Sequence, residues 1–234
     1  MKLIANAARE QGSSHKDMGI PCQDAVETWR SADGSLAVIA AADGAGSRKN
    51  AKESAEAAVR SVITLFCKRA SLDLPEEEMI AAFLEGQKAL CLPEEELGTT
   101  LLFVAVKDNA YLAGHIGDGL ILCREDGAFR LLSVPENGEL SYQTYLLPGD
   151  ECGHFRFSRG VASSGMSFLL ATDGVSTFLC DVDSGAVAPA CEIIDVANRT
   201  LSNQECRLFL HNALTGVFYD LSADDKSIGI MSIQ

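Results

Sequence analysis

The stretch LAVIAAADGAGSRKN, residues 36–50, predicts more about the fold of this chain than any other. Its apolar part, residues 36–42, is typical of a buried β-strand, and it stops at Asp43-Gly44. Asp-Gly between two apolar runs usually forms a hairpin turn, but here small residues and then a helical pattern follow. We therefore expect Asp43 at a strand end, with its carboxylate facing open space, where ligand-binding carboxylates commonly lie.

Strand and helix patterns continue on both sides of this stretch. Alternating or continuous apolar residues predict strands at 2–8, 26–30, 36–42, 99–106, 110–116, 120–124, 129–132, 166–171 and 227–233, the first of them at a sheet edge. Helical spacing predicts helices at 50–68, with Asn50 and Glu53 as a cap, at 75–90, and from Ser202, where Glu205 completes a capping box, to about 217.

The order of these elements indicates the fold class. Short strands from residue 98 to 132, separated by turn residues, predict an antiparallel meander, whereas 12–25 and 133–165 read as loops, the latter with one short strand near 154–157. Strands, two helices, strands, a helix and a strand favour an α+β fold with four layers, α/β/β/α. Two antiparallel sheets would pack face to face with helices outside.

Length and composition limit the possible functions. A chain of 234 residues without a Pro/Ser-rich linker predicts a single domain, 1–234. A net charge of −14 argues against nucleic acid or an anionic membrane as the main partner and is compatible with a bound cation. The eight cysteines form no C-x-x-C pair and read as reduced core thiols. With no signal peptide pattern and no apolar run of about 20 residues, we expect a cytoplasmic protein.

Aspartates in unusual places are the candidate ligands. Asp43 and Asp173 end strands without a returning hairpin, and Asp224 lies just before a strand. If these strands are neighbours, the three carboxylates converge on one rim and repel one another unless a cation lies between them. Oxygen ligands select hard ions such as Mg²⁺ or Mn²⁺, and the four histidines are too scattered to form a zinc set.

Other charged residues are open to two interpretations. Asp118 fits a plain turn or a ligand, and Asp24 fits a structural hydrogen bond or a ligand. We expect Asp225 to be an exposed acid or a strand-start cap and His115 to be packed in the core. His15 lies in a polar loop with glycine and could contact an anion. Arg48 and Lys49 are either solvated charges or contacts with an anion near a phosphate.

Six segments, taken together and in order, resemble the metal-dependent serine/threonine phosphatases of the protein phosphatase 2C type. They are CQDA at 22–25, AADGAGS at 41–47, LGTTLL at 97–102, GHIGDGLIL at 114–122, LLATDGV at 169–175 and ADDKSIGI at 223–230. The resemblance covers nearly the whole chain and implies a β-sandwich flanked by helices, with two divalent ions, Mg²⁺ or Mn²⁺, at one end.

The resemblance also implies roles for individual residues. Asp43 would bridge both ions with the Gly44 carbonyl beside it, and Asp173 and Asp224 would complete the shell of the first ion. Asp24 would support the second ion, and Asp118 matches an acid that can help to hold a further one. The two ions would share a water, lower its pKa and hold it in line with phosphorus.

Some positions depart from the family pattern. Gln23 replaces a glutamate, which should weaken the second ion, and Ala45 replaces a histidine that could act as a general acid. Gly19 stands where an arginine is expected, so that His15, Lys16 or Arg48 would bind phosphate instead. Thr177 replaces an acid, which puts a third ion in doubt.

Three functions follow from these observations. The first is a phosphatase acting on phosphoserine or phosphothreonine in a phosphoprotein, opposing a kinase. The second is a catalytically weak or inactive module that binds a phosphoprotein or regulatory partner. The third is a structural acidic module that uses its aspartates for turns or Ca²⁺. The substrate protein, the oligomeric state and the role of 133–165 do not follow from the sequence.

Overall fold

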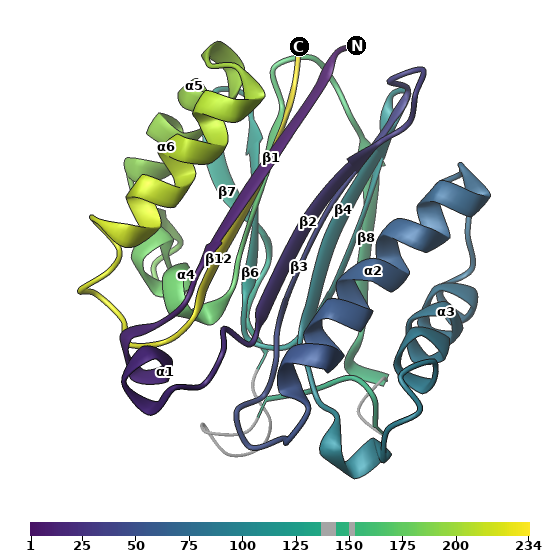
Figure 1. Ribbon diagram of the computed structural model, residues 1–234. Helices are drawn as coiled ribbons and strands as arrows, with labels where there is room; N and C mark the ends of the chain where they lie inside the picture. Colours follow the sequence, from purple (N-terminus) through teal and green to yellow (C-terminus); the bar gives the residue numbers. More distant parts are fainter. Residues whose placement is uncertain (137–143, 150–152) are drawn as a thin grey trace.

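Two antiparallel five-stranded sheets face each other in the computed structural model, which describes residues 1–136, 144–149 and 153–234 (Figure 1). The first sheet has the order β1 (Leu3–Glu10), β12 (Lys226–Ile233), β9 (Ser167–Ala171), β6 (Leu120–Glu125), β7 (Ala128–Ser133). The second has the order β2 (Asp24–Arg30), β3 (Leu36–Asp43), β4 (Leu101–Lys107), β5 (Ala110–Ile116), β8 (Arg156–Val161). Strands β10 (Cys180–Asp181) and β11 (Ala186–Val187) form a small separate ladder.

Helices cover both outer faces of the sandwich (Figure 1). On one side lie α2 (Ala51–Arg69) and α3 (Glu76–Lys88), and on the other α4 (Asp173–Leu179), α5 (Ala190–Thr200) and α6 (Asn203–Thr215). The short helix α1 (Ser13–Met18) follows β1, and a 3₁₀ turn covers Glu94–Glu96. The predicted α+β fold with two antiparallel sheets and flanking helices is confirmed. No helix in the described part of the chain is long and apolar enough to cross a membrane.

Buried apolar side chains form three clusters, one between the sheets and one between each sheet and its helices. The alanine-rich run of β3 is apolar throughout because its residues alternate between two of these clusters. Ala37 and Ile39 face the other sheet, whereas Val38 and Ala40 face the helices. Trp29 on β2, paired with Val38, packs partly buried on the helix side.

The predicted meander over 98–132 is wrong in one respect that affects the site. Strands β4 and β5 pair in one sheet, but β6 and β7 belong to the other. The chain therefore crosses between the sheets at Gly117-Asp118-Gly119 and makes no hairpin there. Because this crossing lies at an end of the sandwich, Asp118 is brought to the rim where β3 and β9 also end.

Several local predictions also differ from the structure. The predicted loop at 12–25 contains helix α1, and Asn50 makes no capping bond because its side chain donates to Glu96 Oε2 at 2.7 Å. The capping box of Ser202 and Glu205 is confirmed. The last helix, predicted to reach about 217, ends at Thr215.

The remaining differences concern the predicted loop and the thiols. The strand expected near 154–157 spans Arg156–Val161, while 137–143 and 150–152 of the predicted loop lie outside the described residues. Of the cysteines expected in the core, Cys67 and Cys91 are exposed, whereas Cys123, Cys180, Cys191 and Cys206 are buried.

A buried charge network anchors α5 to β9 and β12, the strands next to two of the candidate acids. Asp195 on α5 is 2% exposed and accepts hydrogen bonds from Ser167, from Ser232 at 2.8 Å and from Arg199 Nε at 2.8 Å. Arg199 in turn donates to the carbonyls of Gly165 and Met166, both at 2.9 Å. The network supplies hydrogen-bond donors to both oxygens of the buried Asp195 carboxylate. Removing that carboxylate should therefore lower the free energy of unfolding.

We predict that Asp195→Ala lowers the free energy of unfolding by about 3 kcal/mol, because it leaves the Arg199 guanidinium without its carboxylate. The matched control is Glu192→Ala, which removes the other carboxylate on α5 that pairs with Arg124 but is 43% exposed. Its cost should stay below about 1 kcal/mol. Urea unfolding of both variants measures the difference, and equal losses would contradict the role assigned to Asp195.

Candidate metal centre

Three aspartates far apart in the sequence meet at the end of the sandwich. Asp43 ends β3, Asp118 lies in the crossing from β5 to β6, and Asp173 follows β9 as the first residue of α4. One carboxylate oxygen from each lies within 4.8 Å of the others. Carboxylates at this separation could share one metal ion, because they can all approach it at the 2.0–2.6 Å distances typical of Mg²⁺ and Ca²⁺.

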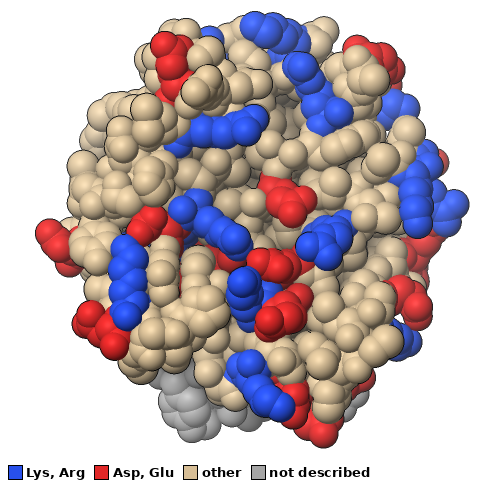
Figure 2. Space-filling model, in the orientation of Figure 1, with Lys and Arg blue, Asp and Glu red and all other residues tan. Residues whose placement is uncertain are grey.

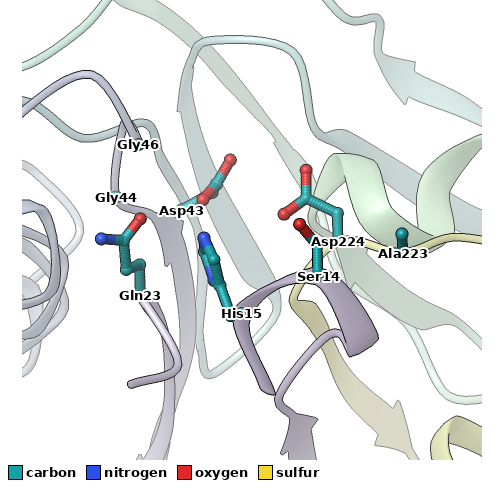
Figure 3. A pocket seen from close by; sticks show the side chains of 8 residues that line it. All are labelled: Ser14, His15, Gln23, Asp43, Gly44, Gly46, Ala223 and Asp224. Atoms are coloured by element: carbon teal, nitrogen blue, oxygen red, sulfur yellow. The ribbon is translucent and has the colours of Figure 1, made fainter. Parts of the chain in front are cut away.

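A cavity of about 340 Å³ opens beside these acids and is lined by Ser14, His15, Gln23, Asp43, Gly44, Gly46, Ala223 and Asp224 (Figure 3). Asp43 and Asp224 reach into it from different elements. Asp224 is not part of the group of three but lines the same cavity. Of the predicted phosphate contacts, His15 lines the cavity, whereas exposed Arg48 donates to the Glu95 carbonyl at 2.9 Å. Lys16 pairs with Glu10 at 2.6 Å.

Backbone contacts fix the position of Asp43. Its N–H donates to Thr100 Oγ1 at 2.9 Å, and its carbonyl accepts from Thr99 Oγ1 at 2.8 Å and from Thr100 N at 2.9 Å. Gly44 follows where only glycine fits, since a Cβ there would lie 2.3 Å from the Ala51 carbonyl oxygen at the start of α2. Thr99 and Thr100 therefore hold the aspartate in place.

Asp24 lies directly behind Asp43 as its partner across the β2–β3 ladder, and it is fully buried. Its Oδ2 accepts a hydrogen bond from Thr172 Oγ1 at 2.7 Å, and its carbonyl accepts one from Arg9 Nη1 at 2.7 Å. Thr172 also accepts from Ser227 N at 2.9 Å. Asp24 thus joins β2 of one sheet to β9 and β12 of the other. Sequence reasoning missed Thr172, although it directly precedes Asp173.

The turn that carries Asp224 is held from three sides. Gly174 at the start of α4 packs so closely that a Cβ would lie 2.0 Å from the Asp225 carbonyl oxygen. Lys226 Nζ is buried and donates to the Ser222 and Asp224 carbonyls at 2.6 and 2.7 Å. The expectation that Asp225 is exposed is wrong. It is 1% exposed and accepts bonds from Gly12 N, His15 Nδ1 and Gln23 N.

The electrostatics of the cluster favour a cation. Burial, followed by the charges of Asp24 and Asp173, raises the pKa of Asp43 well above its usual value. Burial raises the pKa of Asp24 to about 7, and burial followed by the Asp118 charge raises the pKa of Asp173 to about 7. Four of the candidate residues each have a buried oxygen without a hydrogen-bond partner among the described residues: Asp24 Oδ1, Asp118 Oδ1, Asp173 Oδ1 and Gln23 Oε1.

These observations show that the residues present fit a hard divalent ion. At the candidate site, three carboxylates and one amide each place an unpartnered oxygen out of contact with water. His115, by contrast, is buried in β5 with Nδ1 2.8 Å from Ser133 Oγ, as a packed core residue. On the face seen in Figure 2, basic and acidic residues are interspersed and form no continuous basic surface over its described part.

Comparisons with known proteins identify the family. The sequence profile of the family described as protein phosphatase 2C matches residues 11–214. No curated protein sequence matches the chain. The chain therefore belongs to the protein phosphatase 2C family, which is a class of serine/threonine phosphatases, and the resemblance noted in the sequence is confirmed.

Solved structures share the fold along the whole chain. The catalytic domain of the serine/threonine protein phosphatase PstP, in complex with two manganese ions, is 18% identical with a TM-score of 0.67, covering 99% of both chains. PstP/Ppp of Mycobacterium tuberculosis is 17% identical with a TM-score of 0.67, covering 100% of both. A bacterial serine phosphatase is 13% identical with a TM-score of 0.72, covering 98% of this chain and 97% of its own.

We predict that Asp43→Asn stabilises the metal-free protein at pH 8, by about 1–2 kcal/mol, because it removes one charge from a buried, repelling cluster. A carboxyl whose pKa rises on folding binds its proton more tightly in the folded state. The contribution of such a carboxyl to stability is therefore fully present below the unfolded pKa of 3.8 and is lost as the pH rises through the folded pKa, which is about 7 for Asp24 and Asp173. The advantage of the variant should disappear at pH 4.

Urea unfolding in the presence of a chelator, at both pH values, measures this effect. The control is Asp33→Asn in the β2–β3 hairpin, where hydrogen bonds from Ser31 and Ser35 lower the pKa of Asp33 to about 2. That exchange should not stabilise the protein at either pH. A destabilised Asp43→Asn variant at pH 8 would contradict the repulsion.

Proposed function

We propose that residues 1–234 form a single domain that hydrolyses phosphoserine or phosphothreonine in phosphoproteins with the help of Mg²⁺ or Mn²⁺. The observation that carries this proposal is the convergence of Asp43, Asp118 and Asp173, with unpartnered carboxylate oxygens, at one end of the sandwich. Manganese is supported by the description of the PstP catalytic domain in complex with two manganese ions.

In this proposal the carboxylates and one carbonyl would hold the ions. Asp43 and the Gly44 carbonyl would be ligands, together with Asp173 and Asp224. Asp24 would support the second ion from behind Asp43, and Asp118 would help to hold a further one. When bound, the ions supply positive charge to the phosphoryl oxygens and lower the pKa of the attacking water.

The chain's own residues supply the shape of the site. The cavity of about 340 Å³ has room for a phosphorylated side chain, and α1 and the turn before β12 form part of its wall. The hydrogen bonds between the Asp43 backbone and the hydroxyls of Thr99 and Thr100 keep Asp43 in position while charge develops on the phosphoryl group. No observation favours the inactive alternative. Opposition to a kinase and a cytoplasmic location belong to the proposal.

We predict that the purified chain releases phosphate from a phosphoserine peptide with Mn²⁺, and that Asp43→Asn lowers kcat/KM by at least about 100-fold because a charged ligand is lost. The control is Asp108→Asn at an exposed turn with φ 52°, a conformation that asparagine tolerates. Phosphate release measures both variants. Activity that survives a chelator or the Asp43 exchange would refute the proposal.

We predict that Gln23→Glu tightens Mn²⁺ binding about tenfold, because it adds a negative charge whose attraction to the ion is worth on the order of 1–2 kcal/mol after screening. Gln23 Oε1 lines the cavity without a hydrogen-bond partner among the described residues. Isothermal calorimetry measures the dissociation constant. Weaker binding by the variant would place Gln23 outside the reach of the ions.

A further inference from the structure

The cavity holds a histidine that a buried carboxylate fixes from behind. His15 Nδ1 lies 2.8 Å from Asp225 Oδ2, and the two side chains are 15% and 1% exposed. Asp225 Oδ1 also accepts from Gly12 N at 2.7 Å, and Oδ2 from Gln23 N at 2.6 Å. Because both oxygens already accept backbone N–H groups, Nδ1 is the donor in the pair, and the proton chemistry of the ring is left to Nε2.

The other ring nitrogen faces the reacting space. His15 Nε2 has no hydrogen-bond partner in the part of the chain that the structure describes, and the ring lines the cavity together with Asp43. Figure 3 shows the ring rising from α1 toward Asp43, beside Gln23. Of the eight residues that line this cavity, His15 alone can carry a proton on a cationic side chain.

We propose that His15 is the general acid of the reaction and that Asp225 is its positioning residue; this inference rests on the proposed function. As the bond from phosphorus to the seryl or threonyl oxygen breaks, Nε2–H donates its proton to that oxygen, which leaves as the alcohol. A water oxygen forms the new bond to phosphorus. The phosphate product then gives up one proton to solvent, and the imidazole takes one back.

Two simpler roles for His15 explain less of the geometry. A structural role, in which the ring only ties α1 to the start of β12 as a clamp, would need the Nδ1 hydrogen bond alone. It would not require Nε2 to face the cavity. A contact with the substrate phosphate would not require a buried carboxylate behind the ring. A carboxylate that fixes the ring orientation and stabilises the imidazolium is the arrangement that enzymes use for proton transfer.

The variant His15→Asn separates these roles, because the asparagine amide can occupy the place of Nδ1 and keep the bond to Asp225 but has no acid at the place of Nε2. With Mn²⁺, we expect kcat for a phosphoserine peptide to fall about 100-fold. For an aryl phosphate, whose acidic phenol leaves without protonation, we expect kcat to change less than about threefold. Calorimetry should give the same Mn²⁺ dissociation constant as for the wild type.

The control is Asp17→Asn, on the exposed surface of α1, which should leave both substrates unaffected. Full activity of His15→Asn toward both substrates would overturn the proposal in favour of a clamp. Equal losses for both, with a raised KM, would overturn it in favour of a phosphate contact. A wild-type chain that hydrolyses neither substrate would instead refute the proposed function, and the role of His15 with it.

Discussion

Repulsion between buried carboxylates is the constraint on which the site depends. Asp43, Asp118 and Asp173 cannot move apart, because each is fixed by its backbone: a strand end held by two threonines, a crossing between sheets and the first turn of a helix. The apolar clusters on both sides of each sheet supply the free energy that offsets this local cost. The fold thus preorganises the carboxylate oxygens for binding a cation.

The same contacts that build the site also join the two sheets. Thr172 connects Asp24 of one sheet with Ser227 of the other, and Arg9 on β1 donates to the carbonyl of Asp24 on β2. Asp225 ties α1 and the residue before Asp24 to the start of β12. A disturbance of the sandwich at this end therefore changes the positions of the carboxylates directly.

Much of this arrangement could be predicted from the sequence, because strand-end aspartates and apolar runs are local signals. The strands around Asp43 and Asp173 and the capping box at Ser202 are of this kind. What failed depends on distant contacts. Asp118-Gly119 has the sequence of a hairpin turn, and only the partner of β6 reveals the crossing. Asp225 looks like a surface acid, since its three donors come from residues more than 200 positions away.

Trp29, the only tryptophan of the chain, lies at the far end of the strand that begins with Asp24. Its ring packs against the cluster shared by the sheet and the outer helices α2 and α3, whereas the carboxylates lie at the other end of β2. The tryptophan fluorescence of the protein therefore comes from one indole, which reports on the packing of these helices against the sheet. A change in tryptophan emission when a metal ion is added would mean that ion binding at the carboxylates changes the packing at the other end of the sandwich.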